Sequence, residues 1–341
     1  GYSGANYHGS ASNGTPDYPS VEDTLLSTLL KLGYIDPGSG ENRLAHQISF
    51  QRASRTDKGV HALRNALSVN LQCPPSDFPH VRQKINSSLP EDIRVFQIIS
   101  VLSSFNSYRL CTGRNYSYYL PVYSLLGPEA YQAFIHEVKE NATNIDADTQ
   151  HAILNKHILK NEELDLQLDR ANSLCAKFCG THSFHNFTQK NDASPQSMCR
   201  YIVEMHIIQS TIGNVPYLAI RIRGQSFMLN QIRKMVACIL CCINQGLPES
   251  FFDSLLQTDV QKFVPMLPAN GLVLENMDFH CYNAKLDRIQ PFGNAKGKPK
   301  IDTLYHSHEI DYFDAKIQLE ILRKEEREKL MAQWLANTSF E

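Results

Sequence analysis

The sequence predicts an α+β fold with two similar halves, each built from mixed, mostly antiparallel sheets flanked by helices. Strand-like runs occur in pairs that a short turn can join, as at residues 202–208 and 216–224 around the Gly213-Asn214 turn. Each half also contains a run with apolar residues at helical spacing, at 21–32 and at 228–244. Strands in hairpins with separate helices favour α+β layers over a doubly wound parallel sheet.

The length of 341 residues suits two such halves, and changes in composition divide the chain into four blocks. The predicted blocks are an N-terminal half with a polar loop (1–125), an acidic and mainly helical insert (126–170), a C-terminal half (171–283), and a basic linker with a helical extension (284–341).

The spacing of apolar residues and the positions of glycine and proline predict an order of elements for each half. The first half is expected to contain a turn at 1–9, a helix at 21–32 stopped by Gly33, a loop at 37–42, strands at 46–53 and 65–71 around a polar loop, a helix at 81–89, and strands at 93–101 and 115–122. The rest is expected to contain a helix at 169–179 stopped by Gly180, the hairpin, the helix at 228–244, a strand at 271–279, a basic linker at 284–300 and a charged helix at 314–335.

Composition narrows the class of protein. Hydrophobic residues make up 42% of the chain and charged residues 20%, and no stretch approaches the ~20 apolar residues of a membrane helix. The nine cysteines, an odd number, fit a reduced intracellular compartment better than a disulfide framework. No glycine-rich phosphate loop is present, so we expect no nucleotide cofactor. Because the chain begins at Gly1, we expect an incomplete N-terminus.

The distribution of charge is more informative than the formal net charge of -2. Residues 51–64 and 221–234 are rich in arginine and lysine, whereas acidic residues concentrate in 129–169. The two basic stretches could line one groove that binds nucleic acid, or they could be ordinary surface variation. Charge by itself leaves both interpretations open.

The densest polar cluster is Arg55-Thr56-Asp57-Lys58-Gly59-Val60-His61-Ala62, which follows a predicted strand. Loops at strand ends commonly carry catalytic residues. A structural alternative is a turn in which Asp57 bonds to backbone amides and Gly59 supplies the bend.

A second cluster offers four zinc-ligand types within eleven residues: Cys175, Cys179, His182 and His185. Cysteines buried on an apolar helix face explain the pair equally well, so structural zinc is the less favoured alternative. Residues 224–228 begin like a nucleophile elbow centred on Ser226, but the closing glycine of that motif is replaced by Met228, which argues against a hydrolase.

Residues 55–62 resemble the catalytic motif of the TruA family of tRNA pseudouridine synthases, Arg-Thr-Asp-Lys/Ala-Gly-Val-His. Further blocks similar to this family occur over about the first 280 residues, in the same order as in the family. Their amino-acid sequences are most similar to the eukaryotic branch of the family. They are Gly1-Tyr2-Ser3-Gly4 with Tyr7-His8-Gly9, residues 114–118, residues 180–188, residues 224–236, and Gly271-Leu272-Val273-Leu274-Glu275.

The resemblance implies an isomerase that converts specific uridines to pseudouridine in RNA, chiefly tRNA, within a central RNA-binding cleft and without a cofactor. It assigns the catalytic carboxylate to Asp57. It assigns to Tyr116 a catalytic role, stacking on the base and helping to remove the C5 proton, and to Arg233 the positive charge that keeps Asp57 ionised. Tyr116 could instead be an ordinary strand aromatic, and Arg233 a surface charge of a helix.

The resemblance also implies a set of substrate-binding side chains. Arg55 matches the arginine that fills the space left by a flipped nucleotide. The predicted set is Arg55, Lys58, His61, Arg223 and Lys234. The alternative function is a catalytically silent RNA-binding protein or tRNA chaperone on the same fold. The eukaryotic branch implies the nucleus, with the mitochondrion as the alternative; the target uridines and the oligomeric state stay open.

The chain departs from the family pattern at two places. Ser10-Ala11 follows Gly9, where the family has Met-Gln or Trp-Gln. Asn230 stands where the eukaryotic branch commonly has histidine. Neither change removes a predicted catalytic group.

Overall fold

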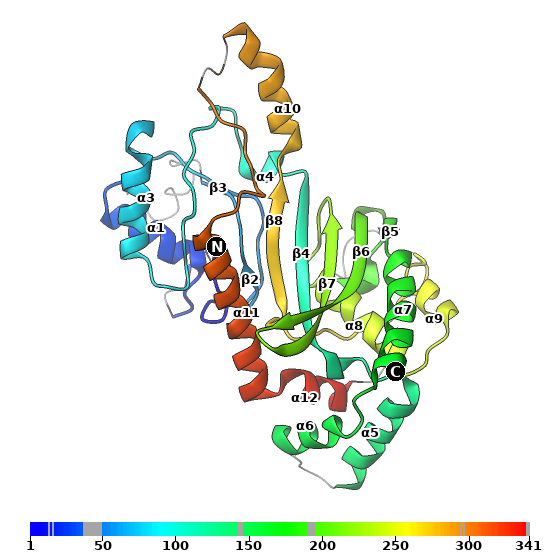
Figure 1. Ribbon diagram of the computed structural model, residues 1–341. Coiled ribbons are helices and arrows are strands. Elements are labelled where there is room, and N and C mark those ends of the chain that lie inside the picture. Colours follow the sequence, from blue (N-terminus) through cyan, green and yellow to red (C-terminus); the bar gives the residue numbers. More distant parts are fainter. Residues whose placement is uncertain are drawn as a thin grey trace. The chain divides into compact units, whose positions relative to one another are not determined.

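The computed structural model describes residues 1–12, 14–15, 17–36, 50–141, 146–189, 195–293, 295 and 297–338. The chain forms two compact units (Figure 1). The first unit comprises Gly1–Asn115 and Val273–Ile317, and the second comprises Tyr116–Leu272 and Gln318–Glu341. Both units combine helices with strands, which confirms the α+β class. None of the helices among the described residues is long and apolar enough to cross a membrane.

The first unit holds short strands and several helices. Its elements are α1 (Val21–Lys31), β1 (Gln51–Arg52), β2 (His61–Ala62), β3 (Leu67–Ser68), η1 (Pro75–Asp77), α3 (Phe78–Ser88), α4 (Ser107–Leu110), the start of β4 (Gly113–Pro121), most of β8 (Leu272–Asp278), α10 (His280–Ile289), η5 (Gln290–Phe292) and the first part of α11 (His308–Glu328). Strand β1 pairs antiparallel with β3, and β2 pairs parallel with β8. The sheets are therefore mixed, as predicted.

Helix α1 confirms the helix predicted at 21–32, and its sequence explains both ends. Ser20 accepts a hydrogen bond from the backbone of Asp23, and the Asp23 side chain bonds back, which completes a capping box. Leu25 and Leu29 lie four residues apart on the buried face. Gly33 then adopts a φ of 75°, which glycine tolerates better than any other residue.

Four further predictions for the first unit have different outcomes. The helix at 81–89 is confirmed by α3. The loop at 37–42 and the first part of the strand at 46–53 lie outside the described residues. The strand predicted at 93–101 is wrong, because within this stretch one isolated bridge, from Ile93 to Tyr2, is formed.

Side chains take the place of a strand partner in this extended segment. The backbone N–H of Val95 donates to Asn86 Oδ1 at 2.8 Å, and Asn86 Nδ2 donates to the Val95 carbonyl at 2.8 Å. The N–H of Leu102 donates to the Tyr282 hydroxyl. Buried backbone groups need partners, but side chains can supply them without a ladder.

The second unit is built on a longer sheet. Its elements are the rest of β4, η2 (Val122–Ser124), α5 (Pro128–Glu140), α6 (Ala147–Asn155), α7 (Asn161–Lys177), β5 (Gly180–Ser183), η3 (His185–Phe187), η4 (Pro195–Met198), β6 (Cys199–Ile212), β7 (Val215–Gly224), α8 (Gln231–Asn244), α9 (Glu249–Ser254), the end of α11 and α12 (Leu330–Asn337). Its strands lie in the order β4–β7–β6–β5.

The β6–β7 hairpin confirms the pair of strands predicted around Gly213-Asn214. The two strands pair antiparallel from Ile202 to Ile212, and Gly213 has a φ of 58° in the turn. Helix α7 packs on β6, where Asn172 bonds to both the N–H and the carbonyl of Ile207. These bonds occupy backbone groups on β6 beyond the part that pairs with β5.

Helix α8 confirms the apolar helix predicted at 228–244. All of its residues except Arg233 are buried, so it is a core helix and not an amphipathic surface helix. It begins after Asn230, which has a left-handed φ of 62°. The exception at Arg233 is one of the predicted catalytic positions.

The C-terminal segment differs from its prediction in two ways. The basic linker predicted at 284–300 is partly helical, since α10 runs to Ile289. The helix predicted at 314–335 begins at His308 and breaks at Lys329, which has a φ of 50°. The buried Glu325 carboxylate accepts the N–H of Met331 and so caps the new helix. Helix α12 then packs against α5 and α6, around Phe134 and Leu154.

Candidate active site

The loop that carries Asp57 lies between β1 and β2 of the first unit, and Thr56 anchors it. The N–H of Thr56 donates to Ser10 Oγ at 2.8 Å, and its carbonyl accepts the N–H of Ser10 at 3.0 Å. The Thr56 hydroxyl pairs with the Tyr2 hydroxyl at 2.8 Å. Thr56 is buried, and each of its backbone and side-chain polar groups has a partner in the N-terminal segment.

A tight turn follows Asp57. The N–H of Val60 donates to the Asp57 carbonyl at 3.1 Å, and Gly59 has a φ of 79°. Gly4 lies directly against this turn, because a Cβ added at Gly4 would lie 2.1 Å from the Val60 carbonyl oxygen. Only glycine allows so close an approach of two backbones. The glycine bend of the structural alternative is therefore present, whereas bonding of the Asp57 side chain to backbone amides stays a prediction, as does the catalytic role of Asp57.

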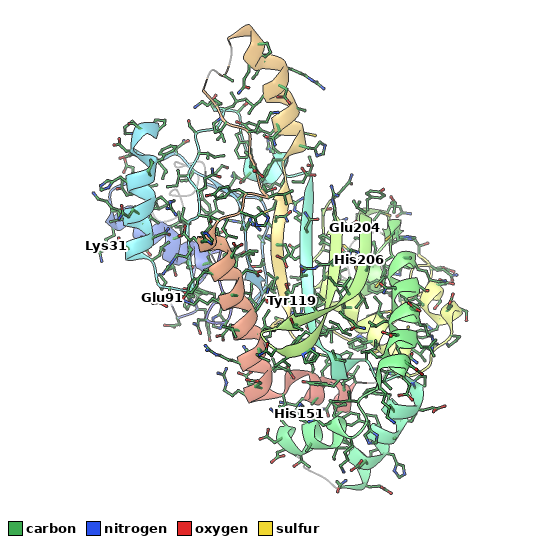
Figure 2. The ribbon with its side chains drawn as sticks, in the orientation of Figure 1. Lys31, Glu91, Tyr119, His151, Glu204 and His206 are labelled. Carbon is green, nitrogen blue, oxygen red and sulfur yellow. The ribbon has the colours of Figure 1, made fainter. Side chains whose placement is uncertain are left out.

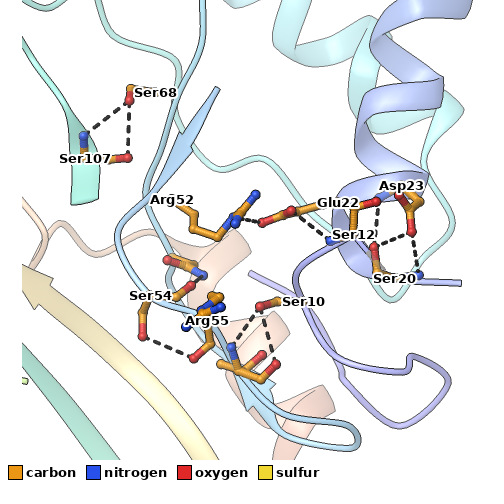
Figure 3. A network of polar contacts seen from close by, with 12 residues as sticks. Ser10, Ser12, Ser20, Glu22, Asp23, Arg52, Ser54, Arg55, Ser68 and Ser107 are labelled. Carbon is orange, nitrogen blue, oxygen red and sulfur yellow. Dashed lines mark hydrogen bonds and ion pairs between the residues drawn. The ribbon is translucent and has the colours of Figure 1, made fainter. Parts of the chain in front are cut away.

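A network of polar contacts around the buried Glu22 supports this loop (Figure 3). Glu22 of α1 forms an ion pair with Arg52 of β1, and its carboxylate accepts the N–H of Ser12 at 3.0 Å. Burial raises the pKa of Glu22 above its ordinary value, while the Ser12 N–H and Arg52 act in the opposite direction. The network joins the segment at 10–12 to the strand that leads into the Asp57 loop.

The predicted residues of the first unit have different environments. Arg55 and Lys58 are exposed, and Asp57 is half-buried. Within this loop the Arg55 carbonyl accepts a hydrogen bond from the Ser54 hydroxyl at 3.5 Å (Figure 3). His61 is fully buried in β2, and its Nδ1 lies 3.3 Å from both the Gly4 nitrogen and the Ser3 hydroxyl. These contacts tie His61 to the N-terminal segment; its role in substrate binding stays a prediction.

Tyr116 and Arg233 belong to the second unit. Tyr116 is 7% exposed and meets Phe227 edge to face, with 5.3 Å between the ring centroids. Arg233 donates from Nε to the Leu267 carbonyl at 2.7 Å and from Nη1 to Asn230 Oδ1 at 3.3 Å. Two acceptors thus orient the guanidinium, and one of them belongs to Asn230, the residue directly before α8.

The two remaining predicted cations of the second unit, Arg223 and Lys234, differ in their exposure to solvent. Arg223 is exposed on β7, opposite Glu204 of β6 (Figure 2). Lys234 is 8% exposed, and its Nζ bonds to the carbonyls of Asn186 and Thr188. Burial lowers the pKa of Lys234. This environment gives Lys234 a structural role, and its substrate-binding role stays a prediction.

Sequence reasoning missed Arg221, a neighbour of these groups. Its guanidinium bonds to the Ser117 hydroxyl and lies 5.8 Å from the centroid of the Tyr119 ring. It pairs across the hairpin with His206, which is exposed on β6 (Figure 2). The available signal was the alternation of arginines at 221 and 223, which places both on one face of β7.

The candidate zinc ligands have other partners. His182 Nε2 lies 2.9 Å from the Cys179 carbonyl oxygen, and His185 Nε2 lies 2.8 Å from the Val260 carbonyl oxygen. Cys175 is fully buried on α7. Within the described parts of the chain, no three acidic, histidine or cysteine side chains are grouped so that they could hold a metal ion.

Comparison with known proteins identifies the class of enzyme. The family model described as tRNA pseudouridine synthase matches residues 174–280, which include β5, the β6–β7 hairpin and α8. With the α+β fold, this match defines an RNA-modifying isomerase of the pseudouridine synthase class.

Relatives extend the match to nearly the whole chain. The chain is 34% identical to the human pseudouridylate synthase 1 homolog, over 98% of this chain and 70% of the human protein. It is 31% identical to the Saccharomyces cerevisiae tRNA pseudouridine(27/28) synthase, over 85% of each protein. The mouse pseudouridylate synthase 1 homolog is 32% identical over 98% of this chain. The chain therefore belongs to the TruA family of pseudouridine synthases, as its motifs implied.

Proposed function

We propose that Asp57 is the catalytic carboxylate with which this pseudouridine synthase isomerises uridines in tRNA. The observation that carries the assignment is the fixed backbone on both sides of Asp57. Thr56 is bonded to Ser10 before it, and Val60 closes the turn after it. A half-buried carboxylate on a braced turn suits a group that must meet one atom of a substrate.

The reaction sets the demands on the site. The bond from the ribose to N1 of uracil breaks, the base turns, and a bond from the ribose to C5 forms. The C5 hydrogen then leaves as a proton, and N1 takes up a proton. No electrons are gained or lost, and no nucleotide energy is required. A carboxylate suits this chemistry as a nucleophile or as a base toward the ribose.

Other residues take supporting roles in this proposal. Arg233 supplies the positive charge that favours the ionised form of Asp57. Its orientation by the Leu267 carbonyl and Asn230 supports this role, because the guanidinium needs no reorganisation. Tyr116 stacks on the base, and Arg55, which is exposed, fills the space that the flipped nucleotide leaves.

The substrate class follows from the relatives. The yeast relative is named for positions 27 and 28 of tRNA, and it aligns over 85% of each chain. We therefore propose tRNA as the substrate and positions 27 and 28 as the first to examine. The exposed Lys58 and Arg223 are proposed to contact phosphates, which makes binding salt-dependent. By resemblance to the eukaryotic branch, the proposed compartment is the nucleus.

The test is release of the C5 hydrogen from tRNA labelled at that position. Asp57→Ala is expected to abolish release while tRNA binding persists. Asp77→Ala is the matched control, because Asp77 is exposed and makes no capping bond at the start of α3. If Asp57→Ala releases label as fast as the wild type, the assignment fails. If the wild type binds tRNA and releases none, the protein is a silent RNA binder.

A further inference from the structure

We propose that Ser10 is a positioning residue for Asp57, acting through the Thr56 peptide. The inference rests on the proposed catalytic role of Asp57. It concerns a residue that the motif itself does not contain and that lies 46 positions from Thr56 in the sequence.

The contact between Ser10 and Thr56 is reciprocal. Ser10 Oγ accepts the N–H of Thr56 at 2.8 Å, and the N–H of Ser10 donates to the Thr56 carbonyl at 3.0 Å. That carbonyl belongs to the peptide bond that enters Asp57, so the two bonds fix both peptide planes that flank Thr56. Ser10 is 3% exposed and Thr56 is 7% exposed. At such burial a backbone N–H without an acceptor is costly, and the Ser10 hydroxyl supplies the acceptor.

Ser10 is itself held from the other side. Its carbonyl accepts the N–H of Glu22 at 3.1 Å, and the preceding carbonyl, of Gly9, accepts the N–H of Val21 at 3.3 Å. Two backbone hydrogen bonds therefore attach the segment at 9–10 to the first turn of α1. The Glu22 carboxylate continues the link through Arg52 of β1, as Figure 3 shows. Ser10 is therefore bonded both to helix α1 and to the loop that carries Asp57.

The nature of the side chain matters at this position. The related family pattern has methionine or tryptophan after the glycine, and neither side chain has a hydroxyl that could accept the Thr56 N–H as Ser10 does. In this chain the Ser10 hydroxyl holds the peptide before the proposed catalytic aspartate. A catalytic group displaced by about 1 Å can lose on the order of 100-fold in rate.

The test compares Ser10→Ala with Ser10→Thr. Alanine removes the acceptor for the Thr56 N–H, whereas threonine keeps a hydroxyl. For Ser10→Ala we expect a single-turnover rate of C5 hydrogen release lowered by about 10- to 100-fold, with the Kd for tRNA within about twofold of the wild type. Ser10→Thr should restore most of the rate. A purely structural role would lower the fraction of active enzyme and leave the single-turnover rate of the folded fraction unchanged.

Other outcomes decide against the inference. A wild-type rate in folded Ser10→Ala overturns it, and so does a loss of rate that the tRNA Kd fully explains. If Ser10→Ala does not fold, Ser10→Cys carries the test, because a thiol is a weak acceptor of similar size; a wild-type rate in that variant also overturns the inference. Asp57→Ala is measured alongside. If Asp57→Ala is active, the proposed function fails; if it is inactive and Ser10→Ala is not impaired, this inference alone fails.

Discussion

Tyr123 donates a hydrogen bond of 2.5 Å from its hydroxyl to the buried carboxylate of Glu325. The pair joins the segment after β4 to the helix break between α11 and α12, across 202 positions of the sequence. Glu325 also accepts the N–H of Met331 at the start of α12. One carboxylate thus holds both the strand end and the C-terminal helix.

Tyr123→Phe removes the donor and leaves Glu325 without that partner. A buried carboxylate that loses a hydrogen bond costs about 1–3 kcal/mol, so we expect the free energy of unfolding to fall by about that amount. Tyr108→Phe is the control, because Tyr108 is 64% exposed. Chemical denaturation of both variants and the wild type measures the difference. Equal stability of the two variants would contradict the role assigned to the pair.

Glu325 also predicts a dependence of stability on pH. Burial raises its pKa, and the Tyr123 hydroxyl, the Met331 N–H and Lys329 oppose the rise only in part. Because the folded pKa lies above the unfolded one, this group contributes stability below the unfolded pKa and loses it as pH rises through the folded pKa. The titratable groups that interact with Glu325 are Tyr118, Tyr123, Tyr217, Glu328 and Lys329.

Glu325→Gln should remove this part of the pH dependence. We expect wild-type stability relative to Glu325→Gln to decrease as pH rises above about 4.3, where the unfolded carboxyl titrates. Glu326→Gln, at an exposed position of the same helix, should keep the wild-type slope. Denaturation series at several pH values provide the measurement, and parallel curves for all three proteins would be inconsistent with the raised pKa.

Gly4→Ala should damage both stability and catalysis. The added Cβ would lie 2.1 Å from the Val60 carbonyl oxygen, so one of two backbone segments must move. Overpacking of this kind costs about 1–3 kcal/mol. Because Val60 closes the turn at Asp57, the single-turnover rate should also fall. Ala5→Ser, one residue further on, should change stability by no more than about 0.5 kcal/mol. A fully active and stable Gly4→Ala would show that the turn tolerates displacement.

Several elements were predictable because their signals are local. The β6–β7 hairpin follows from alternation around Gly213, and α1 follows from Ser20, Asp23 and Gly33, which lie within a few residues of the ends that they define. The apolar run at 228–244 likewise predicted the helix α8. In each case one stretch of sequence contains all of the determinants.

Other features depend on partners far away in the sequence. The segment at 93–101 looked like a strand, but the Asn86 side chain bonds to the backbone of Val95, and Tyr282 bonds to the N–H of Leu102 directly after the segment. The break in the C-terminal helix depends on Glu325 and on a residue with positive φ, Lys329, that has no glycine signal. In the candidate site, the Asp57 motif was recognisable, whereas Ser10 appeared in the sequence only as a departure from the family pattern.

The central claim is that Asp57 is the catalytic carboxylate, and the most direct measurement follows pseudouridine formation at single positions. tRNA that lacks pseudouridine would be treated with wild-type protein, Asp57→Ala or Asp57→Asn, and the product at positions 27 and 28 quantified. We expect complete conversion by the wild type at one or both positions, and no detectable product from either variant at equal tRNA occupancy. Pseudouridine formed by Asp57→Asn or Asp57→Ala at the wild-type rate would contradict the claim.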